Sequence, residues 1–375
     1  MRILQLGRFW NDQHGGIERH VALLSRGLAA QGADVTNLVA SADLRGSDTD
    51  YEGYRLVQAP SFGKAASTAI SPALVGKALA MHVQQAFDVI HLHLPDPLSH
   101  LVSMVMPGKA KRVITWHSDI VKQKHLLRLY EPWQRALLQR SDAVVAATHA
   151  HFATSSQIPA DLPPTKLHVI PYGIDASMLT HAAEQQIASI RAHACGKTLF
   201  FALGRHVYYK GFDVLLQAMR SVDGFLILGG DGEMRASLEL QAQQIGVAGK
   251  VLFAGRIPEA ELVAYFHACD VFCLPSVERS EAFGLVQLEA MACGKPVINT
   301  GLDNGVNEVS PDGETGLTVP VRDAQALGAA MNRLAQDPGL RELLGGRARQ
   351  RALGHYSMSQ MTERHMALYK GLLAA

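Results

Sequence analysis

Short apolar runs alternate with amphipathic segments along most of the chain. The runs are rich in β-branched residues and are bounded by turn-forming residues, which is typical of buried strands. The segments between them have apolar positions three or four residues apart, as in 16–32, and this spacing predicts helices. We predict strands at 2–7, 34–40, 88–92, 112–116, 142–148 and 167–171, and then at 197–204, 224–230, 250–255, 270–275 and 295–300.

The alternation of strands and helices predicts two α/β domains, because parallel strands need crossover helices. A chain of 375 residues is too long to fold around one ordinary hydrophobic core, and the pattern of strands and helices restarts after a polar stretch. We predict an N-terminal domain at 1–176, a C-terminal domain at 177–355 and a last helix at 356–375. Facing each other, such domains would leave a cleft at the carboxyl ends of both sheets. The last helix would either cap the second sheet or pack on the first domain.

Composition and charge exclude several classes of protein. Apolar residues make up 48% of the chain, charged residues 18%, and the formal net charge is +1, which argues against disorder and against a basic nucleic-acid binder. The chain opens on the strand-like MRILQLG and has no long apolar run, so we expect neither a signal peptide nor a transmembrane helix. Cys195, Cys269, Cys273 and Cys293 show no CxxC spacing, so we expect buried, reduced thiols and no cysteine metal pair.

Two cations share one predicted strand-to-helix loop, LGRHVYYKG at 203–211. Arg205 offers a planar bidentate fork and Lys210 a compact point charge, and both suit a diphosphate. The following helix start adds free N–H groups and a positive dipole end. A solvated basic loop is the alternative.

Glycine-rich loops precede two other predicted helices. Gly15 and Gly16, in GGIERH, allow close backbone approach to a ligand, although the stretch is not GxGxxG and no acid follows at dinucleotide spacing. A flexible loop is the alternative there. GGDGE, at 229–233, is by itself more typical of a structural turn.

Two histidines and two aspartates are weaker candidates. His93 and His117 end predicted strands of the first domain, on the side where ligands bind, although a single histidine is more often structural. Asp48 and Asp50 form a DxD string of the kind that holds a metal in some sugar-transferring enzymes. They fall in a predicted polar loop with no strand before it, so we interpret the string as chance.

The stretch RSEAFGLVQLEAMACGKPV, at 279–297, contains two acids around a predicted helix start. Glu281 lies in the loop before the helix and Glu289 lies inside it. Carboxylates accept two hydroxyl hydrogen bonds at once, and helix-start N–H groups are unpaired donors. Those donors are the backbone N–H groups of Phe283, Gly284 and Leu285. The arrangement suits a polyhydroxylated, phosphorylated ligand, and the alternative is a dipole-balancing acid with a surface acid.

In this order, the motifs resemble the retaining family-4 glycosyltransferases of the GT-B fold over essentially the whole chain. The motifs are GG at 15–16, His117, VIPYGID at 169–175, GRxxxxKG at 204–211, GGDGE, E-x7-E at 281–289 followed by AMACGKPV, and GETGLTV at 313–319. The resemblance implies two facing Rossmann-like α/β/α domains, an interdomain cleft, and a last helix that crosses back to the N-terminal domain. Tyr172 stands where the family often has Asn, and this difference concerns the interdomain turn. We assign no role to Tyr172 or to His149.

The resemblance also implies roles for matching residues. Arg205 and Lys210 would grip the donor diphosphate, which Gly15 and Gly16 would approach from the other domain. Glu281 would bind hydroxyls of the donor sugar, and Phe283, Gly284 and Leu285 would donate backbone N–H groups. Glu289 would bind the ribose hydroxyls of the nucleotide. His117 would lie beside the reacting carbon. The implied catalytic set is Glu281, His117, Arg205 and Lys210.

The implied reaction transfers a hexosyl group from a nucleotide diphosphate sugar to a hydroxyl, with retention. It needs neither a metal nor another cofactor, because cations and helix starts stabilise the leaving diphosphate. The stretch 282–300 is similar to bacterial mannosyl- and rhamnosyl-transferring members, which favours GDP-mannose ahead of a UDP-hexose with a small-molecule acceptor. Two competing hypotheses are a nucleotide-sugar epimerase of the same fold and a non-catalytic binding protein, and the GRxxxxKG and E-x7-E pair disfavours both.

A basic amphipathic helix is predicted at 122–140, where leucines and Trp133 alternate with cations. Basic charge beside exposed apolar residues suits an anionic membrane surface. The alternative is a solvated helix whose leucines pack on the sheet. We therefore expect a cytoplasmic protein, peripheral on the inner membrane face, that extends a lipid-linked glycan in cell-surface polysaccharide synthesis.

Overall fold

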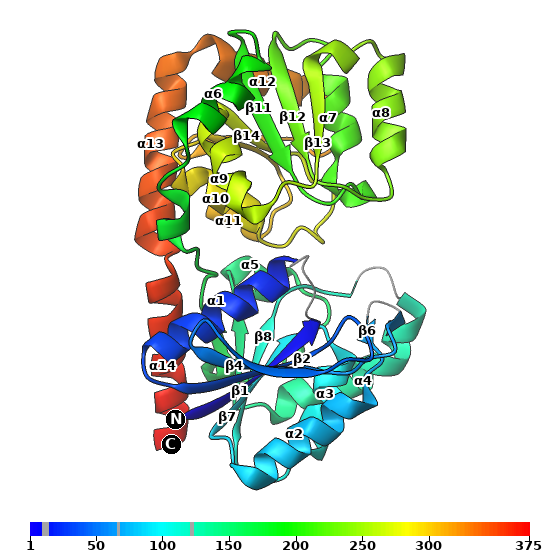
Figure 1. Ribbon diagram of the computed structural model, residues 1–375, viewed down its shortest axis with the longest axis vertical. Helices are drawn as coiled ribbons and strands as arrows, with labels where there is room; N and C mark the ends of the chain where they lie inside the picture. Colours follow the sequence, from blue (N-terminus) through cyan, green and yellow to red (C-terminus); the bar gives the residue numbers. More distant parts are fainter. Residues whose placement is uncertain (10–14, 66–67, 121–123) are drawn as a thin grey trace. The chain divides into compact units, whose positions relative to one another are not determined.

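The computed structural model describes residues 1–9, 15–65, 68–120 and 124–375 (Figure 1). The described chain divides into two compact units. Unit 1 contains residues 1–173 and 358–375, and unit 2 contains residues 174–357. These limits lie a few residues from the predicted ones at 176 and 356, and both chain termini belong to unit 1. The predicted interdomain cleft stays a prediction.

Unit 1 is built on a sheet whose described strands have the order β10-β9-β8-β7-β1-β2-β4-β3. These strands are β1 (Arg2–Phe9), β2 (Asp34–Ala40), β3 (Ser47–Tyr51), β4 (Tyr54–Ala59), β7 (Val89–Leu94), β8 (Lys111–Trp116), β9 (Ala143–Ala146) and β10 (Leu167–Val169), and a separate small pair is β5 (Lys64–Ala65) with β6 (Thr68–Ala69). The helices are α1 (Gly16–Ala30), α2 (Pro72–Gln84), α3 (Pro97–Val105), α4 (Lys124–Arg140), α5 (His149–Thr154) and α14 (Met358–Ala374), with a 3-10 turn η1 (Pro164–Lys166). All six strands predicted for this domain are present.

The β3–β4 hairpin was not predicted, and it changes the interpretation of the DxD string. Asp48 lies in β3, where both of its carboxylate oxygens accept hydrogen bonds from Arg55 of β4, at 2.8 and 2.7 Å. The predicted polar loop was therefore wrong. Glu52 and Gly53, with φ of 46° and 86°, form the tight turn between the two strands. Positive φ at both central positions is the mark of a type I′ hairpin.

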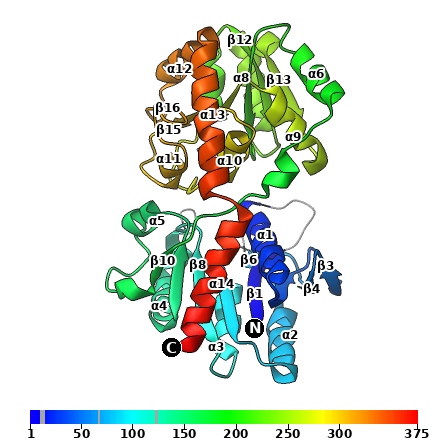
Figure 2. The same cartoon turned by 90° about the vertical axis from the view of Figure 1, so that its left-hand side faces the viewer.

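The terminal helix α14 packs against α1 and β8 within unit 1 (Figure 2). Gly27 of α1 makes this close approach feasible, because a Cβ atom there would lie 2.2 Å from the Thr362 side chain. Tyr369 is fully buried under the sheet with Leu24 and Leu28 of α1. Of the two positions that the sequence left open for this helix, the structure shows the one on the first domain.

Unit 2, in which every residue is described, has a six-stranded parallel sheet of order β13-β12-β11-β14-β15-β16. The strands are β11 (Thr198–Leu203), β12 (Gly224–Gly229), β13 (Val251–Gly255), β14 (Val271–Leu274), β15 (Val297–Thr300) and β16 (Gly316–Val319). The helices are η2 (Ala176–Leu179), α6 (Glu184–Ala192), η3 (Tyr208–Lys210), α7 (Phe212–Ala218), α8 (Arg235–Gln244), η4 (Ala248–Lys250), α9 (Glu259–Ala268), α10 (Leu285–Ala292), α11 (Gly305–Val309), α12 (Ala324–Gln336) and α13 (Pro338–His355). The five predicted strands are present, and β16 is added.

The strand order reverses beside the first strand of each unit. β1 lies between β2 and β7, and β11 lies between β12 and β14. Loops that leave the carboxyl ends of two such neighbours turn to opposite faces of the sheet, and the crevice between them is where α/β folds bind ligands. The chain topology therefore marks the loops after β1 and β7 in unit 1 and after β11 and β14 in unit 2.

Two predictions about composition have different outcomes. All four cysteines are free, with Cys269 and Cys273 buried, but Cys195 is exposed, so the prediction of uniformly buried thiols was wrong. Cys195 follows α6 in a turn, where its backbone has a positive φ of 48°. In the described part of the chain, every helix is too short or too polar to span a bilayer.

Replacing Tyr369 with Ala is expected to lower the free energy of unfolding of unit 1 by about 3–5 kcal/mol, because it removes a fully buried ring. All three tryptophans of the sequence lie before residue 174, so tryptophan fluorescence during urea unfolding reports on unit 1. Leu373→Ala, on an exposed position of the same helix, is the control and should cost less than about 0.5 kcal/mol. Equal effects of the two changes would contradict the packing of α14.

Candidate functional site

A buried ion pair lies at the switch point of unit 2. Lys210 ends the loop after β11, and Glu281 lies in the loop after β14. The Lys210 Nζ lies 2.5 Å from Glu281 Oε2, and the two side chains are only 11% and 12% exposed. A charge-assisted hydrogen bond in so little solvent is strong, and either residue alone would be a costly buried charge. The pair therefore holds both residues in one place.

Glycines around Lys210 permit close contacts between three loops. The Lys210 stem lies over Gly204, where a Cβ atom would be 3.0 Å from the Lys210 Cε. Gly230 has φ of 107°, and a Cβ atom there would fall 1.9 Å from the Gly204 carbonyl oxygen. Gly211 has φ of 67°, and a Cβ atom would fall 2.0 Å from the Pro275 carbonyl oxygen. The GGDGE motif is thus the structural turn that the sequence favoured, and it supports the Lys210 loop.

Further polar groups fix Glu281. Ser276 donates its hydroxyl to Glu281 Oε2 at 3.2 Å, and the Ser276 carbonyl accepts a hydrogen bond from the Thr300 hydroxyl. Asn304 donates from its side-chain amide to the Glu281 carbonyl at 2.8 Å. Among the described residues, Glu281 Oε1 receives none of these bonds and can accept from a ligand. Sequence reasoning missed Ser276, Thr300 and Asn304, because they come from separate strand ends.

The helix α10 begins at Leu285, one residue after the predicted start. Gly284 is its N-cap in the left-handed conformation, with φ of 72°, and Leu285 is the first helical residue. Phe283 is buried and packs near Tyr356. Helix-start N–H groups have no acceptor inside the helix, so this end of α10 favours negative charge. Glu289 lies on α10 and is only 5% exposed, so the alternative of a surface acid was wrong.

Arg205 is the exposed cation of this site. It follows Gly204 directly after β11, and in unit 2 no acidic side chain lies within ion-pair distance of it. Because Glu281 compensates the charge of Lys210 and no acid of unit 2 compensates that of Arg205, the loop after β11 carries net positive charge within this unit. Such a loop attracts anions, and a guanidinium favours bidentate binding of phosphate.

In unit 1, Gly15 and Gly16 form the exposed start of α1 after β1. Gly15 is the N-cap with extended backbone, and its carbonyl accepts the Arg19 N–H at 3.0 Å. A Cβ atom on Gly15 would lie 2.5 Å from the Glu18 carboxylate. Both glycines are exposed, and their approach to a ligand stays a prediction.

His117 directly follows β8 and is part of a buried hydrogen-bond network. Its Nδ1 lies 2.6 Å from the Tyr172 hydroxyl, and its Nε2 lies 3.0 Å from His93 Nδ1. The other nitrogen of His93, Nε2, donates to Gln5 Oε1 at 2.8 Å. Both ring nitrogens of His117 are thus engaged. Tyr172, to which the sequence assigned only an interdomain turn, instead holds the ring of His117.

Three more histidines surround this pair, on β7, α1 and α14. His91 accepts from or donates to Thr115 at 2.7 Å and Tyr369 at 2.6 Å. The rings of His20 and His365 pack against the cluster, with centroids of His20 and His117 5.3 Å apart. Burial lowers the pKa of His93 to about 3 and that of His365 to about 4. Burial, reinforced by neighbouring histidines, also lowers the pKa of His20, His91 and His117 well below its usual value, so the rings are neutral.

Sequence patterns contained part of this cluster. His91 and His93 are two apart on a strand, so they point to the same face. The contributions of His20, His365 and Tyr369 could not be found in this way, because only the packing of α1 and α14 on the sheet brings them to the same point.

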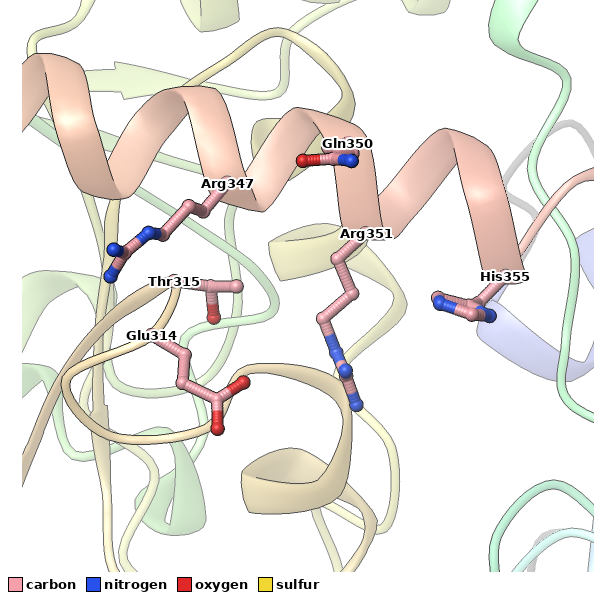
Figure 3. Close-up of a pocket in the computed structure, with 6 residues that line it drawn as sticks. All are labelled: Glu314, Thr315, Arg347, Gln350, Arg351 and His355. Carbon is pink, nitrogen blue, oxygen red and sulfur yellow. The ribbon is translucent and has the colours of Figure 1, made fainter.

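A pocket of about 350 Å³ opens elsewhere in unit 2, between α13 and the turn before β16 (Figure 3). Arg347 and Arg351 extend from α13 toward the loop that carries Glu314. The Arg351 guanidinium already donates to the carbonyls of Glu308 and Val309. None of the predicted site residues lines this pocket, and we assign no function to it.

The site can therefore bind an anion and hydroxyl groups together. In unit 2, cations and a helix start lie beside a carboxylate with a free oxygen, and this combination suits a phosphorylated sugar. In unit 1, an open helix start lies at the same carboxyl edge as the buried histidines.

Two family models together match almost the whole chain. The model described as Glycosyltransferase Family 4 matches residues 14–178, and the one described as Glycosyl transferases group 1 matches residues 184–351. The gap between the matched regions falls near the change from unit 1 to unit 2.

Relatives of similar length are bacterial mannosyl- or rhamnosyltransferases, according to their names. The O-antigen chain mannosyltransferase C of Escherichia coli is 30% identical and covers 100% of this chain and 99% of its own. The D-rhamnosyltransferase WbpZ of Pseudomonas aeruginosa is 31% identical, over 94% of this chain and 91% of its own. The phosphatidyl-myo-inositol mannosyltransferase of Mycobacterium leprae is 30% identical, over 99% and 96%.

Solved structures show the same fold. The sucrose-phosphate synthase of Thermosynechococcus elongatus superposes with a TM-score of 0.85 at 24% identity, covering 100% of this chain and 99% of its own. HepE of Anabaena, solved in complex with UDP-glucose, superposes with a TM-score of 0.78 at 20% identity, covering 99% and 100%. The two Rossmann-like units with parallel sheets are those of the GT-B fold.

Proposed function

The chain belongs to the family-4 glycosyltransferases, and we propose that it transfers a mannosyl group from GDP-mannose to a hydroxyl of a lipid-linked glycan in cell-surface polysaccharide synthesis. The Lys210–Glu281 pair at the switch point of unit 2 is the observation that supports this proposal most directly. The names of the three relatives favour a mannosyl or a related hexosyl group. These relatives include no epimerase.

We assign the donor diphosphate to Arg205, Lys210 and the start of α10. Arg205 is exposed and unpaired in unit 2, and Lys210 is held in place by Glu281. As the glycosidic bond breaks, negative charge grows on the leaving diphosphate, and fixed cations and helix-start N–H groups stabilise that charge without reorganising. The same diphosphate is the proposed ligand of the open backbone at Gly15 and Gly16.

We assign the donor sugar to Glu281 and the N–H groups of Phe283, Gly284 and Leu285. Glu281 Oε1 can accept a sugar hydroxyl while Oε2 stays bonded to Lys210 and Ser276. One carboxylate would thereby connect the sugar to the cation that binds its leaving group. Glu289 is the proposed partner of the nucleotide ribose, by family resemblance.

His117 is proposed to lie beside the sugar and to shape the site around the reacting carbon. Because Tyr172 and His93 engage both ring nitrogens, this ring acts as a fixed, neutral wall and not as a proton carrier. No side chain in this set is placed as a covalent nucleophile. We therefore propose retention through same-face attack, in which the leaving phosphate accepts the proton of the acceptor hydroxyl.

We also propose that the transfer step needs no metal ion. In many transferases a divalent ion neutralises the donor diphosphate. Here Arg205 and Lys210 have the right charge for that role, and the helix start adds to it. Activity that persists in excess EDTA would support this part of the proposal.

The acceptor is proposed to lie at a membrane surface that α4 contacts. Leu126, Leu129 and Trp133 of α4 are 55%, 75% and 58% exposed and recur along one side of the helix, while Leu137 and Leu138 are buried against the sheet. The neighbouring α3, joined to α4 by a 3.2 Å hydrogen bond between His100 and Tyr130, adds further exposed apolar side chains. These are Leu101, Met104 and Val105. Residues 122 and 123 of the predicted helix lie outside the described residues.

GDP-mannose is expected to raise the melting temperature more than UDP-glucose or dTDP-rhamnose at equal concentration. A ligand at 100 times its Kd stabilises the folded state by about 2.7 kcal/mol, which is a shift of several degrees. Differential scanning fluorimetry measures this shift. If UDP-glucose gave the largest shift, the proposed donor would be wrong but the proposed transferase activity would stand. If no donor gave a shift, the proposed nucleotide-sugar site would be contradicted.

Lys210→Ala should reduce turnover about 100- to 1,000-fold, because it removes one fixed charge that faces the leaving group. Turnover is measured as release of nucleoside diphosphate, and circular dichroism checks the fold. Lys197→Ala removes an exposed lysine paired with Asp223 and should leave turnover unchanged. Turnover within about threefold of the wild type in Lys210→Ala would contradict the assigned role.

Liposome flotation tests the membrane surface. The protein should float with vesicles that contain phosphatidylglycerol at low salt and not with pure phosphatidylcholine, because the attraction to anionic lipid is screened by salt. The double variant Leu129→Ser/Trp133→Ser should lose this binding, while Leu240→Ser, at an exposed leucine of α8, should keep it. Absence of wild-type binding at low salt would remove the membrane proposal.

A further inference from the structure

His20 is an anomaly in the buried cluster of unit 1. It lies on α1, is only 3% exposed, and neither of its ring nitrogens has a hydrogen-bond partner among the described residues. A buried polar group without a partner destabilises the fold, because it has lost its hydrogen bonds to water. The other histidines of the cluster nearest to it, His93 and His117, are bonded to protein groups. The unsatisfied nitrogens therefore point to a ligand that the rest of the fold does not supply.

The geometry around His20 fits a small cation. One nitrogen of each of His20, His93 and His117 lies within 4.8 Å of the other two. In a tetrahedral zinc site with bonds of about 2.0–2.1 Å, neighbouring ligand nitrogens are roughly 3.4 Å apart. The closest pair here, His93 Nδ1 and His117 Nε2, is 3.0 Å apart. Small rotations of the rings would thus bring three nitrogens to the ligand positions.

The partners of the remaining nitrogens match those of metal-bound histidines. A ligating imidazole commonly donates its second N–H to an oxygen acceptor, which fixes the tautomer and orients the ring. His93 Nε2 faces Gln5 Oε1, and His117 Nδ1 faces the Tyr172 hydroxyl. Binding would require only that the proton between His117 and His93 move to His117 Nδ1, which then donates to Tyr172. Both lone pairs would then face the same point as His20.

We propose that His20, His93 and His117 bind a first-row divalent transition-metal ion, Zn²⁺ by preference. Three imidazoles and no carboxylate favour Zn²⁺, Co²⁺ or Ni²⁺ over Mg²⁺ and Ca²⁺, which take oxygen ligands. Three neutral imidazoles hold Zn²⁺ in known enzymes, with the fourth position left to water or another ligand. The metal site shares His117 with the proposed sugar site, so the inference rests on the proposed function for that ring, while the transfer step itself is proposed to run without a metal.

The surroundings set limits on the affinity. The three rings are buried against one another, and a neutral imidazole nitrogen offers the lone pair that binds metal. Arg8, whose charge also lowers the pKa of His117, opposes a cation, although its influence is smaller than that of burial. His93 is fully enclosed, so an ion would reach the site past His20 and His117, which keep a small exposed fraction.

The test uses the full-length, tag-free protein after treatment with a chelator. Isothermal titration with Zn²⁺ should give one equivalent per chain, and Co²⁺ should develop the intense visible bands of a four-coordinate ion. X-ray absorption of the zinc-loaded wild type should show three imidazole nitrogens. None of these measurements depends on turnover, so a negative result for metal binding can be distinguished from a failure of the proposed function.

His20→Phe is the test variant, because an apolar ring of similar shape removes the ligand and the unsatisfied nitrogens together. The variant should lower the zinc affinity at least about 100-fold, which is a larger effect than removing a residue that only hydrogen-bonds to a metal ligand. His206→Phe is the matched control, since His206 of unit 2 is also buried with both nitrogens unpartnered, and it should bind zinc as the wild type does. Equal affinity in His20→Phe and wild type, or fewer than three imidazoles in the wild-type spectrum, would overturn the proposal.

Discussion

The candidate donor site depends on one constraint, the nearly buried ion pair between Lys210 and Glu281. An unpaired buried charge at either position would destabilise the fold, so each residue depends on the other to neutralise its charge. The pair joins the loop after β11 to the loop after β14, and these two strands are neighbours at the point where the strand order reverses. Gly204, after β11, lets the Lys210 stem pack on the backbone, and Gly230, after β12, lets its own loop pack against Gly204. The sheet topology and the ion pair therefore select the same place.

Unit 1 uses polar groups differently. Where unit 2 presents an exposed guanidinium and an accessible carboxylate oxygen, unit 1 buries a group of neutral histidines under α1 and α14. Gln5, Thr115, Tyr172 and Tyr369 bond to His91, His93 and His117, and among the described residues both ring nitrogens of His20 and the Nε2 of His365 have no partner. The fixed charges of unit 2 suit a reaction that leaves charge on a phosphate, whereas the buried histidines of unit 1 form a neutral surface.

Much of the candidate site could be predicted from the sequence because its residues follow strands directly. Arg205, Lys210 and Glu281 each come within a few residues of a strand end, and parallel strands bring such loops to one edge. The supporting residues Ser276, Thr300 and Asn304 could not be predicted, since they lie at the ends of two strands, β14 and β15, and short polar residues are common at strand ends. The β3–β4 hairpin was missed because its strands are polar and short. Tyr172 was misjudged because its hydroxyl meets His117 only in the folded chain.

The sequence by itself determined the class of fold, the eleven strands of the two sheets that it predicted, the family and the main donor-site candidates. These follow from local periodicity and from motifs whose order along the chain is specific. Only the tertiary structure decided where the last helix packs, which oxygen of Glu281 is free, and that histidines from β7, α1, α14 and the end of β8 meet in one cluster. Such facts depend on contacts between residues far apart in the sequence, such as His91 and Tyr369, which are 278 positions apart, and no local pattern encodes them.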